Sequence, residues 1–187
     1  NVSILLLDNN NLTGDLSEYP WKHLKCLRRI SINNNKLTGI SKEFAQGLSE
    51  AQCQLEEIFM VHNKITYVAP EIAFLKDSLV TLWLDDNELN NLPDSICKLG
   101  QLLSLTLVNN KLTSIPNNMD KLSKLRCLTL SGNPTLKTIP TSIGNLDSLD
   151  FLGVDDGLEG LDSSIVDEGK NAIKQQLKKM HRASNMI

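Results

Sequence analysis

Aromatic residues are scarce in this sequence, since Phe, Trp and Tyr together make up 4% of its 187 residues. Long apolar runs are missing as well. None approaches the roughly 18–20 residues that a helix needs to cross a bilayer, which excludes a membrane span. Neither positive nor negative charge strongly dominates, because the net charge is −3 and the pI is about 5.6. The missing excess of basic residues argues against a general nucleic-acid binder.

Cysteine is also sparse, with four residues and no C-x-x-C pair, so zinc and dithiol redox motifs are excluded. Isolated thiols favour a reducing compartment. Two glycosylation sequons, at Asn1 and Asn11, point the other way, but such short motifs arise easily in an Asn-rich chain. We therefore expect a cytoplasmic protein, with a cytoskeletal or nuclear location as an alternative. The chain begins at Asn1 without a leader-like segment, and we expect it to be a fragment.

Leucine and asparagine are abundant instead, with 33 and 19 residues. Both recur in one pattern, L-x-x-L-x-L-x-x-N-x-L, whose first position falls at residues 2, 27, 55, 79, 102, 125 and 149. The successive spacings are 25, 28, 24, 23, 23 and 24 residues. Seven units at nearly equal spacing indicate a stacked repeat fold, in which neighbouring units bury a shared core.

Each unit predicts a short strand, because apolar positions four and six alternate with more polar neighbours. The Asn at position nine is expected to bond backbone groups where the chain turns away. Pro93, Pro116 and Pro140 follow Leu or Ile and predict compact, short-helical arms in units four to six. The longer arms, 14–26 and 39–54, predict one or two helical turns. Their inward-facing residues are expected to be Trp21, Leu24, Phe44 and Leu48.

The C-terminal stretch departs from the pattern. Val166, Ile173, Leu177 and Met180 recur at helical spacing, and Ser163 or Ser164 is expected to cap the helix start. We therefore predict a solenoid over 1–160, followed over 161–187 by a capping helix and basic tail. The basic residues are interpreted as the solvated face of the helix, with membrane or partner contact as the alternative.

These repeats resemble those of intracellular leucine-rich repeat proteins, over essentially the whole chain. The 23-residue period with LP or IP is similar to the typical class, which includes Ras-pathway scaffolds, plant Ras-group repeat proteins and Roco GTPases. The segment IVDEGKNAIKQQL, from Ile165 to Leu177, resembles their post-repeat segment I-V-x-x-G-x-x-A-I-x-x-x-L. The resemblance implies an α/β leucine-rich repeat solenoid of about seven repeats. It would have a parallel concave β-sheet, irregular or short-helical convex arms and a C-terminal capping helix.

Catalytic chemistry finds little support. No phosphate loop G-x-x-x-x-G-K-[ST], H-E-x-x-H or G-x-S-x-G motif occurs, and only three His are present. The acid pairs 85–86 and 155–156 fall three units apart, or roughly 14 Å at about 4.8 Å per strand, too far to share a cation. We therefore predict a protein that is not an enzyme and uses no cofactor or metal.

The concave face, formed by positions three, five and seven of each unit, is the expected binding surface. Position five places Phe59 and Trp83 on adjacent strands, and exposed aromatics ringed by charge are typical interface anchors. The acidic neighbours favour a protein partner with a basic or apolar segment. The candidate binding residues are Phe59, Trp83, Glu57, Val61, His62, Asp85, Asp86 and Arg29.

The function predicted from this face is that of a protein-interaction module or scaffold. One alternative is a structural subunit of a large cytoskeletal or ciliary assembly, in which the convex arms and the basic tail would make the contacts. Another is the regulatory repeat domain of a larger signalling enzyme. The fold alone does not choose among these functions, and the oligomeric state stays open.

Overall fold

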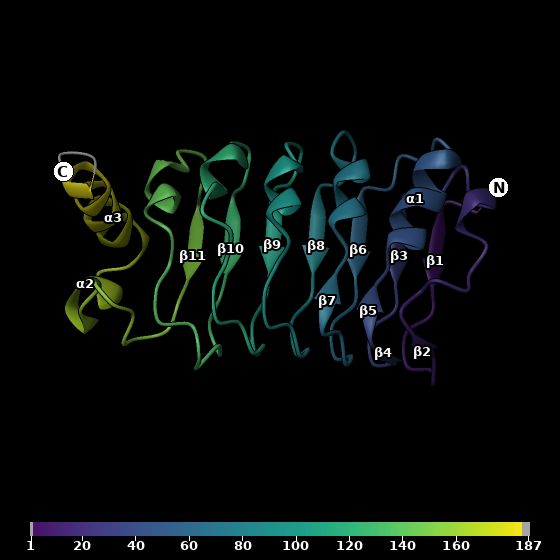
Figure 1. The fold of residues 1–187 in the computed structure, drawn as a ribbon, viewed down its shortest axis with the longest axis horizontal. Helices are drawn as coiled ribbons and strands as arrows, with labels where there is room; N and C mark the ends of the chain where they lie inside the picture. The colour runs from purple at the N-terminus through teal and green to yellow at the C-terminus, as the bar shows by residue number, and fades with distance from the viewer. Residues whose placement is uncertain (1, 185–187) are drawn as a thin grey trace.

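The computed structural model describes residues 2–184, and its main feature is one parallel sheet of seven strands arranged in chain order. Figure 1 shows these strands side by side along the long axis of the molecule. Each strand pairs with the next at identical pattern positions, so that Phe59 lies opposite Trp83. The strands are β1 (Ile4–Leu6), β3 (Arg29–Ser31), β6 (Glu57–Phe59), β8 (Thr81–Trp83), β9 (Ser104–Thr106), β10 (Cys127–Thr129) and β11 (Phe151–Gly153). The predicted seven-unit solenoid is confirmed.

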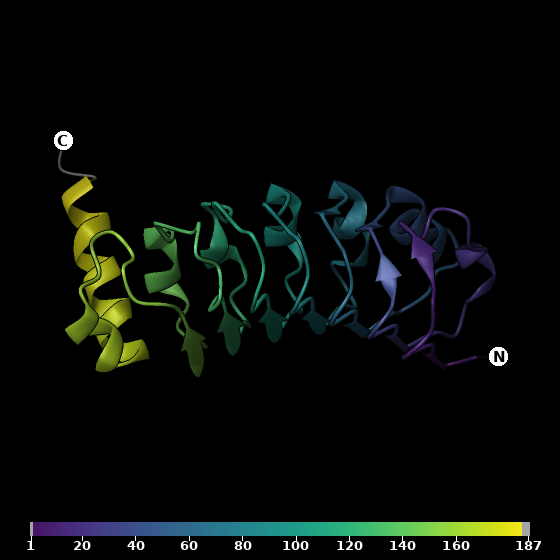
Figure 2. The same cartoon turned by 90° about the horizontal axis from the view of Figure 1, so that it is seen from below.

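The arms form a second layer. Figure 2 shows the helices along one side of the molecule and the seven strands along the other. Units four to six have the short arms predicted from their prolines, here as 3₁₀-helices. The arm helices are η1 (Trp21–His23), α1 (Lys42–Glu50), η2 (Pro70–Leu75), η3 (Asp94–Lys98), η4 (Met119–Lys121) and η5 (Thr141–Asn145).

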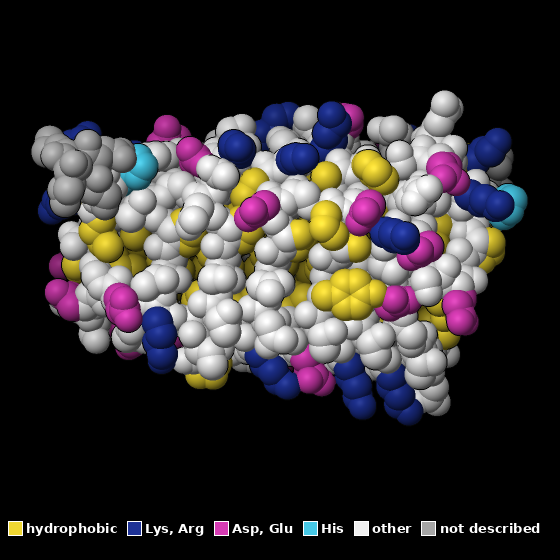
Figure 3. Space-filling model, viewed as in Figure 1, with side chains coloured by type: hydrophobic (Ala, Val, Ile, Leu, Met, Phe, Trp, Pro, Cys, Tyr) yellow, Lys and Arg dark blue, Asp and Glu magenta, His cyan; other side chains and the backbone are white. Residues whose placement is uncertain are grey.

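The first three units carry additional strands in their arms. β2 (Thr13–Gly14) pairs with β4 (Lys36–Leu37), and β5 (Gly39–Ile40) pairs with β7 (Tyr67–Val68), both in parallel. A space-filling view from the helix side shows acidic and hydrophobic side chains together over α1, β5 and β7 (Figure 3). The longer arms therefore add two short sheets that the regular units do not have.

The core lies between the two layers and consists mainly of the repeated aliphatic positions. Leu82, Leu105 and Leu128, at position four of successive units, are fully buried. The inward-facing residues expected in the long arms are buried or packed against this core, and the Trp21 and Phe44 rings meet edge to face with centroids 4.8 Å apart. At about 25 cal/mol per Å² of buried apolar surface, this continuous core is the main stabilising contribution.

The asparagines of position nine form the expected ladder along the turns. In unit five, the Asn110 side chain accepts a bond from the Leu89 N–H at 3.0 Å and donates to the Leu84 carbonyl at 2.9 Å. Asn35, Asn63, Asn87 and Asn133 repeat this arrangement toward the preceding unit. Asn10 in the first unit is exposed and donates only to carbonyls of its own turn. The ladder satisfies buried backbone groups, which are costly when unpaired.

Position eight has a backbone requirement that the pattern did not predict. In the first six units this residue has a positive φ, between 53° and 74°, in the left-handed region. Asn, Asp, His and Gly tolerate that region better than other residues. The occupants are Asn9, Asn34, His62, Asp86, Asn109 and Gly132.

The C-terminal region differs from the single helix predicted. Two helices are present, α2 (Ser163–Asp167) and α3 (Lys170–Ser184), and they are separated at Gly169, which has φ 83°. The predicted serine cap is wrong, because Asp162 is the capping residue and its carboxylate accepts from the Ile165 N–H at 3.1 Å. An acidic side chain at a helix N-terminus bonds the free N–H groups and favours the dipole.

Three basic residues of α3, Lys170, Lys174 and Lys178, contact the solenoid end. Lys170 donates to the Leu149 carbonyl at 2.8 Å, and Lys174 donates to the Leu146 carbonyl at 2.5 Å. Burial lowers the pKa of Lys174. These two charges thus satisfy backbone oxygens at the last unit instead of forming one solvated face. Among residues 2–184, no helix combines the length and apolar character needed to cross a membrane.

Candidate partner-binding face

The concave face carries an aromatic pair where the sequence placed it. Phe59 and Trp83 project from neighbouring strands β6 and β8, with ring centroids 5.0 Å apart and planes at 85°. Trp83 is 40% exposed and Phe59 is half-buried. The Trp83 indole N–H donates to the Ser104 hydroxyl of β9 at 3.0 Å. The pair is therefore held in a fixed edge-to-face orientation while much of the indole stays open to solvent.

Arg29 and Glu57 lie beside this pair. The Arg29 Nε donates to the Glu57 carboxylate, and the guanidinium carbon is 5.5 Å from the centre of the Phe59 ring. The hydrogen bond that Arg29 donates to Glu57 raises the pKa of Arg29 further above its already high ordinary value. The Glu57 charge is thus paired within the chain, and Arg29 adds a cation next to the aromatic surface.

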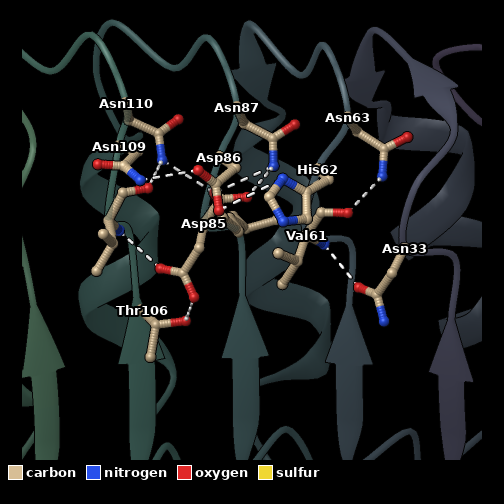
Figure 4. A network of polar contacts seen from close by, with 12 residues as sticks. Asn33, Val61, His62, Asn63, Asp85, Asp86, Asn87, Thr106, Asn109 and Asn110 are labelled. Atoms are coloured by element: carbon tan, nitrogen blue, oxygen red, sulfur yellow. Dashed lines mark hydrogen bonds and ion pairs between the residues drawn. The ribbon is translucent and has the colours of Figure 1, made fainter.

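Asp85 is a bridge between units. Its carboxylate accepts from the Val108 N–H at 2.7 Å and from the Thr106 hydroxyl at 2.8 Å, as Figure 4 shows for Thr106. Burial raises the pKa of Asp85, although these two hydrogen bonds oppose the change. Asp8 forms the same bridge to Ser31 and to the Asn33 N–H of unit two. Asp85 therefore stabilises strand stacking at the edge of the concave face.

His62 and Asp86 form a polar row at the turn that follows the strands. The His62 Nδ1 lies 3.5 Å from the Asp86 carboxylate, which also accepts from the Asn109 amide at 2.8 Å. Figure 4 shows this row beside the asparagine ladder. Both residues occupy position eight, where the backbone has a positive φ. The residue types found there are therefore limited by the backbone conformation as well as by any contact with a partner.

The structure thus brings the candidate residues together in two groups. Arg29, Glu57, Phe59 and Trp83 form a cluster on the strands, which we call the aromatic cluster. Asp85, Asp86 and His62 lie at the adjoining strand ends, and Val61 is half-buried at the end of β6. Sequence reasoning missed the bridging role of Asp85. The signal was an Asp at position seven followed by a hydroxyl residue at position five of the next unit, as in Asp8 with Ser31.

Comparison with protein families supports the architecture. The family model described as Leucine rich repeat matches residues 77–135, which covers units four and five and part of unit six. The fold is that of a leucine-rich repeat solenoid. The match falls on the regular units, where the 23-residue period and the proline-led arms are clearest.

Two curated relatives share parts of this solenoid. The human Leucine-rich repeat transmembrane protein FLRT2 is 30% identical over 89 residues, which are 48% of this chain and 13% of that protein. The Probable inactive serine/threonine-protein kinase roco10 of Dictyostelium discoideum is 36% identical over 91 residues, 49% of this chain and 3% of that protein. The chain thus spans a small part of the length of these relatives.

Solved structures with the same fold include two plant receptors, each in a complex. The plant peptide hormone receptor RGFR1 in complex with RGF2 has a TM-score of 0.67 and 27% identity, covering 82% of this chain and 24% of that one. The GASSHO1/SCHENGEN3 ectodomain from Arabidopsis thaliana, in complex with CASPARIAN STRIP INTEGRITY FACTOR 2, has a TM-score of 0.60 and 28% identity, with the same coverage. Leucine-rich repeat solenoids of this kind are typically modules for protein interaction.

Proposed function

We propose that this chain is a protein-interaction module whose concave face binds a partner through the aromatic cluster. The observation that carries the proposal is the exposed Trp83 ring, fixed against Phe59 at 5.0 Å on a rigid sheet. Aromatic and Arg side chains dominate the binding energy of protein interfaces, and aromatic rings bury large areas while losing little conformational entropy. The function is one of binding, without a catalytic role.

The partner segment is proposed to be apolar, with basic groups at its ends. Glu57 is already paired with Arg29, and Asp85 accepts two hydrogen bonds from its own neighbours. The surface at the centre of the cluster is therefore largely aromatic. Asp86 lies 3.5 Å from His62 and accepts one hydrogen bond from the Asn109 amide, and we propose that its charge attracts a basic residue at the rim.

The structural neighbours support a peptide-like partner, because two of them are described as receptors in complex with RGF2 and with CASPARIAN STRIP INTEGRITY FACTOR 2. A sheet of parallel strands about 4.8 Å apart offers an extended segment one contact position per strand. The exposed side chains of Trp83 on β8 and Phe151 on β11 then offer apolar contacts at two separate strands of the sheet.

A second candidate is a regulatory repeat module within a longer signalling protein. The match to roco10 favours it, because that protein is far longer than the shared region. We also propose a cytoplasmic location, supported by free thiols spread along the solenoid, with Cys53 and Cys97 buried. Immunolocalisation of the endogenous protein, with a glycosidase digest, tests this location, and a glycan on Asn11 would contradict it.

The experiment that tests the binding function is affinity capture with mass spectrometry, followed by titration of the identified partner. The Phe59→Ala, Trp83→Ala double variant should weaken binding by at least about tenfold, since two interface anchors are removed. Its thermal unfolding should change little, because an edge-to-face aromatic pair contributes only about 0.5–1.5 kcal/mol beyond area burial.

Phe74→Ala is the matched control, because Phe74 is 52% exposed but lies on η2, on the opposite layer. It should bind the partner like the unchanged protein. Retention of full affinity by the double variant would contradict the proposed function, as would an equal loss in Phe74→Ala.

A further inference from the structure

The last strand of the sheet carries a second exposed aromatic ring on the concave face. Phe151 on β11 is 56% exposed, compared with 40% for Trp83 on β8. Alternate residues of a strand face the same side, and Leu152, which follows Phe151, is buried in the core. Phe151 and Gly153 therefore both face the concave side. The strands β9 and β10 lie between the two rings (Figure 1).

The Phe151 ring reaches toward position five of its own unit, which is the position that Trp83 occupies in unit four. A Cβ added to Gly153 would lie 3.3 Å from the Cε1 atom of the Phe151 ring. Gly153 pairs in register with Thr129 of β10. Thr129 pairs with Thr106 of β9, which pairs with Trp83. The edge of the Phe151 ring thus lies in the same row of the sheet as Trp83, and the absence of a side chain at residue 153 leaves room for it.

The distance between the two rings selects the form of a bound segment. Three strand steps of about 4.8 Å place them about 14 Å apart. Residues four apart in an extended chain face the same side and span about 14 Å, at about 3.4 Å per residue. Same-face residues of a helix, seven or eleven apart, fall at about 10.5 and 16.5 Å, so a helix fits this spacing less well. Between the rings, Thr106 is 9% exposed and Thr129 is half-buried, so both leave the row open.

The charge on this part of the concave face is negative. Positions three, five, seven and eight of units four to seven hold four Asp and no Lys or Arg. The acids follow β8 and β11 in pairs, as Asp85, Asp86, Asp155 and Asp156. Arg126, at position two of unit six, is paired with Asp150 at 2.6 Å. Each exposed ring thus has two carboxylates beyond the end of its own strand, and such an arrangement is complementary to a basic residue beside each apolar one.

We infer that Phe151, with Gly153 beside it, is a second contact site for the partner of the aromatic cluster. The partner then binds as an extended segment with two apolar residues four positions apart, each next to a basic residue. One apolar residue contacts Trp83 and the other contacts Phe151. The inference rests on the function proposed above, because Trp83 supplies the first contact. Two contacts on one segment strengthen binding, because the second forms within a complex that is already associated.

The test is an NMR titration of the isotope-labelled chain with the blocked peptide Arg-Leu-Ala-Ala-Ala-Leu-Arg. We expect saturable shifts of the Trp83 indole N–H and of the Phe151 and Gly153 amides. The isomer Arg-Leu-Ala-Ala-Leu-Ala-Arg has the same composition, but its second leucine points to the other side of an extended chain. It should bind at least about fivefold more weakly, because one buried leucine is lost.

A third peptide tests the charge. Citrulline in place of both arginines keeps the size of the side chains but removes the charge, and this peptide should bind at least about threefold more weakly than the first. Equal binding would overturn the basic character of the segment.

Two outcomes of the titration would overturn the second contact site and leave the proposed function in place. They are equal affinity of the two leucine isomers, and saturable shifts at Trp83 with none at Phe151 or Gly153. Absence of shifts with either isomer would also overturn the inference. The proposed function is judged separately, by capture of the native partner with the Phe59→Ala, Trp83→Ala double variant.

Variants of the last strand sharpen the test. Phe151→Ala should reduce the preference between the two isomers to within about twofold, and Phe151→Leu, which keeps an apolar side chain, should retain most of it. Gly153→Val should lower the preference while keeping the ring, because the added side chain displaces the ring from the row. Phe74→Ala on η2 is the control that should leave the preference unchanged. Thermal unfolding should change little in Phe151→Ala, because that side chain is largely exposed. An undiminished preference in Phe151→Ala would overturn the inference.

Discussion

Units four to six and units one to three share one sheet but differ in their arms. The later units have 3₁₀-helices that follow a proline, with a period of 23 or 24 residues. The earlier units have a nine-residue α-helix, two extra two-stranded sheets and a Tyr67 ring that packs over Gly39. Strand pairing is nonetheless in the same register throughout.

The difference follows from what each layer must satisfy. Neighbouring strands lie about 4.8 Å apart and exchange backbone bonds at every unit, so an insertion there would break the ladder. An arm needs only to return an apolar residue to the core, and Phe44 on α1 and Ile96 on η3 both do so while fully buried. Differences in length and structure between units are therefore tolerated in the arms. In this molecule the contacts that do not repeat from unit to unit are found there.

The largest expected effect is on the free energy of unfolding, and it should differ between an interior unit and the first unit. Asn110→Ala should lower the free energy of unfolding by about 2–4 kcal/mol, because the buried Leu89 N–H loses its acceptor and a small cavity is left. Asn10→Ala should cost less than about 1 kcal/mol, because its bonds are exposed and stay within its own turn. Urea denaturation followed by tryptophan fluorescence measures both. Equal losses would show that the ladder contributes no more inside the stack than at its end.

The sequence was sufficient to predict the structural features that repeat from unit to unit. The strand positions, the asparagine ladder and the adjacency of Phe59 and Trp83 all follow from one local period, since a residue in one unit faces its counterpart in the next. The left-handed position eight could also have been found, because Asn, Asp, His and Gly recur there. The binding role of Phe59 and Trp83 stays a prediction.

Features that do not repeat could not be derived in this way. The bond from Tyr67 to Asp15 joins residues 52 positions apart and depends on how two irregular arms pack. Ser41 precedes α1 without making a capping bond, although a serine at this position ordinarily caps the helix, so its role depends on the folded arm. The break between α2 and α3 depends on φ 83° at Gly169, within a stretch whose apolar spacing is continuous with a single helix.

A smaller effect on folding stability is expected when either of two glycines is replaced by alanine, and its sign should differ between the two regions. Gly39→Ala in the irregular arm should destabilise the fold by about 1 kcal/mol, because the added methyl displaces the Tyr67 ring. Gly100→Ala in the regular region should stabilise it by about 0.4–1 kcal/mol, because the methyl meets open space and the unfolded chain loses freedom. Thermal unfolding measures both changes. Destabilisation of equal size would mean that Gly39 is not specifically required beneath the ring.

The smallest effect concerns the pH dependence of the Tyr67 bond. Partial burial, together with the hydrogen bond to Asp15 and the negative charges of Asp15 and Glu43, raises the pKa of Tyr67 to about 12, and the hydrogen bond from Tyr67 lowers the pKa of Asp15. A raised tyrosine pKa stabilises the fold below about pH 10, the unfolded value, and this contribution is lost as the pH rises toward the folded value. A lowered aspartate pKa contributes above about pH 4 and is lost as the pH falls through the folded value.

The free energy of unfolding should therefore differ between the unchanged protein and Tyr67→Phe by a constant amount from about pH 4 to about pH 10, and the difference should shrink above that range. It should stay below about 1 kcal/mol, because Tyr67 is 39% exposed and solvent screens the interaction. Urea midpoints of both proteins at pH values of about 7, 9 and 11 measure it, and the subtraction removes the lysine titrations that the two share. A difference that persists undiminished at the highest pH would show that the aromatic ring packed on Gly39, and not the hydroxyl bonded to Asp15, holds the irregular arms together.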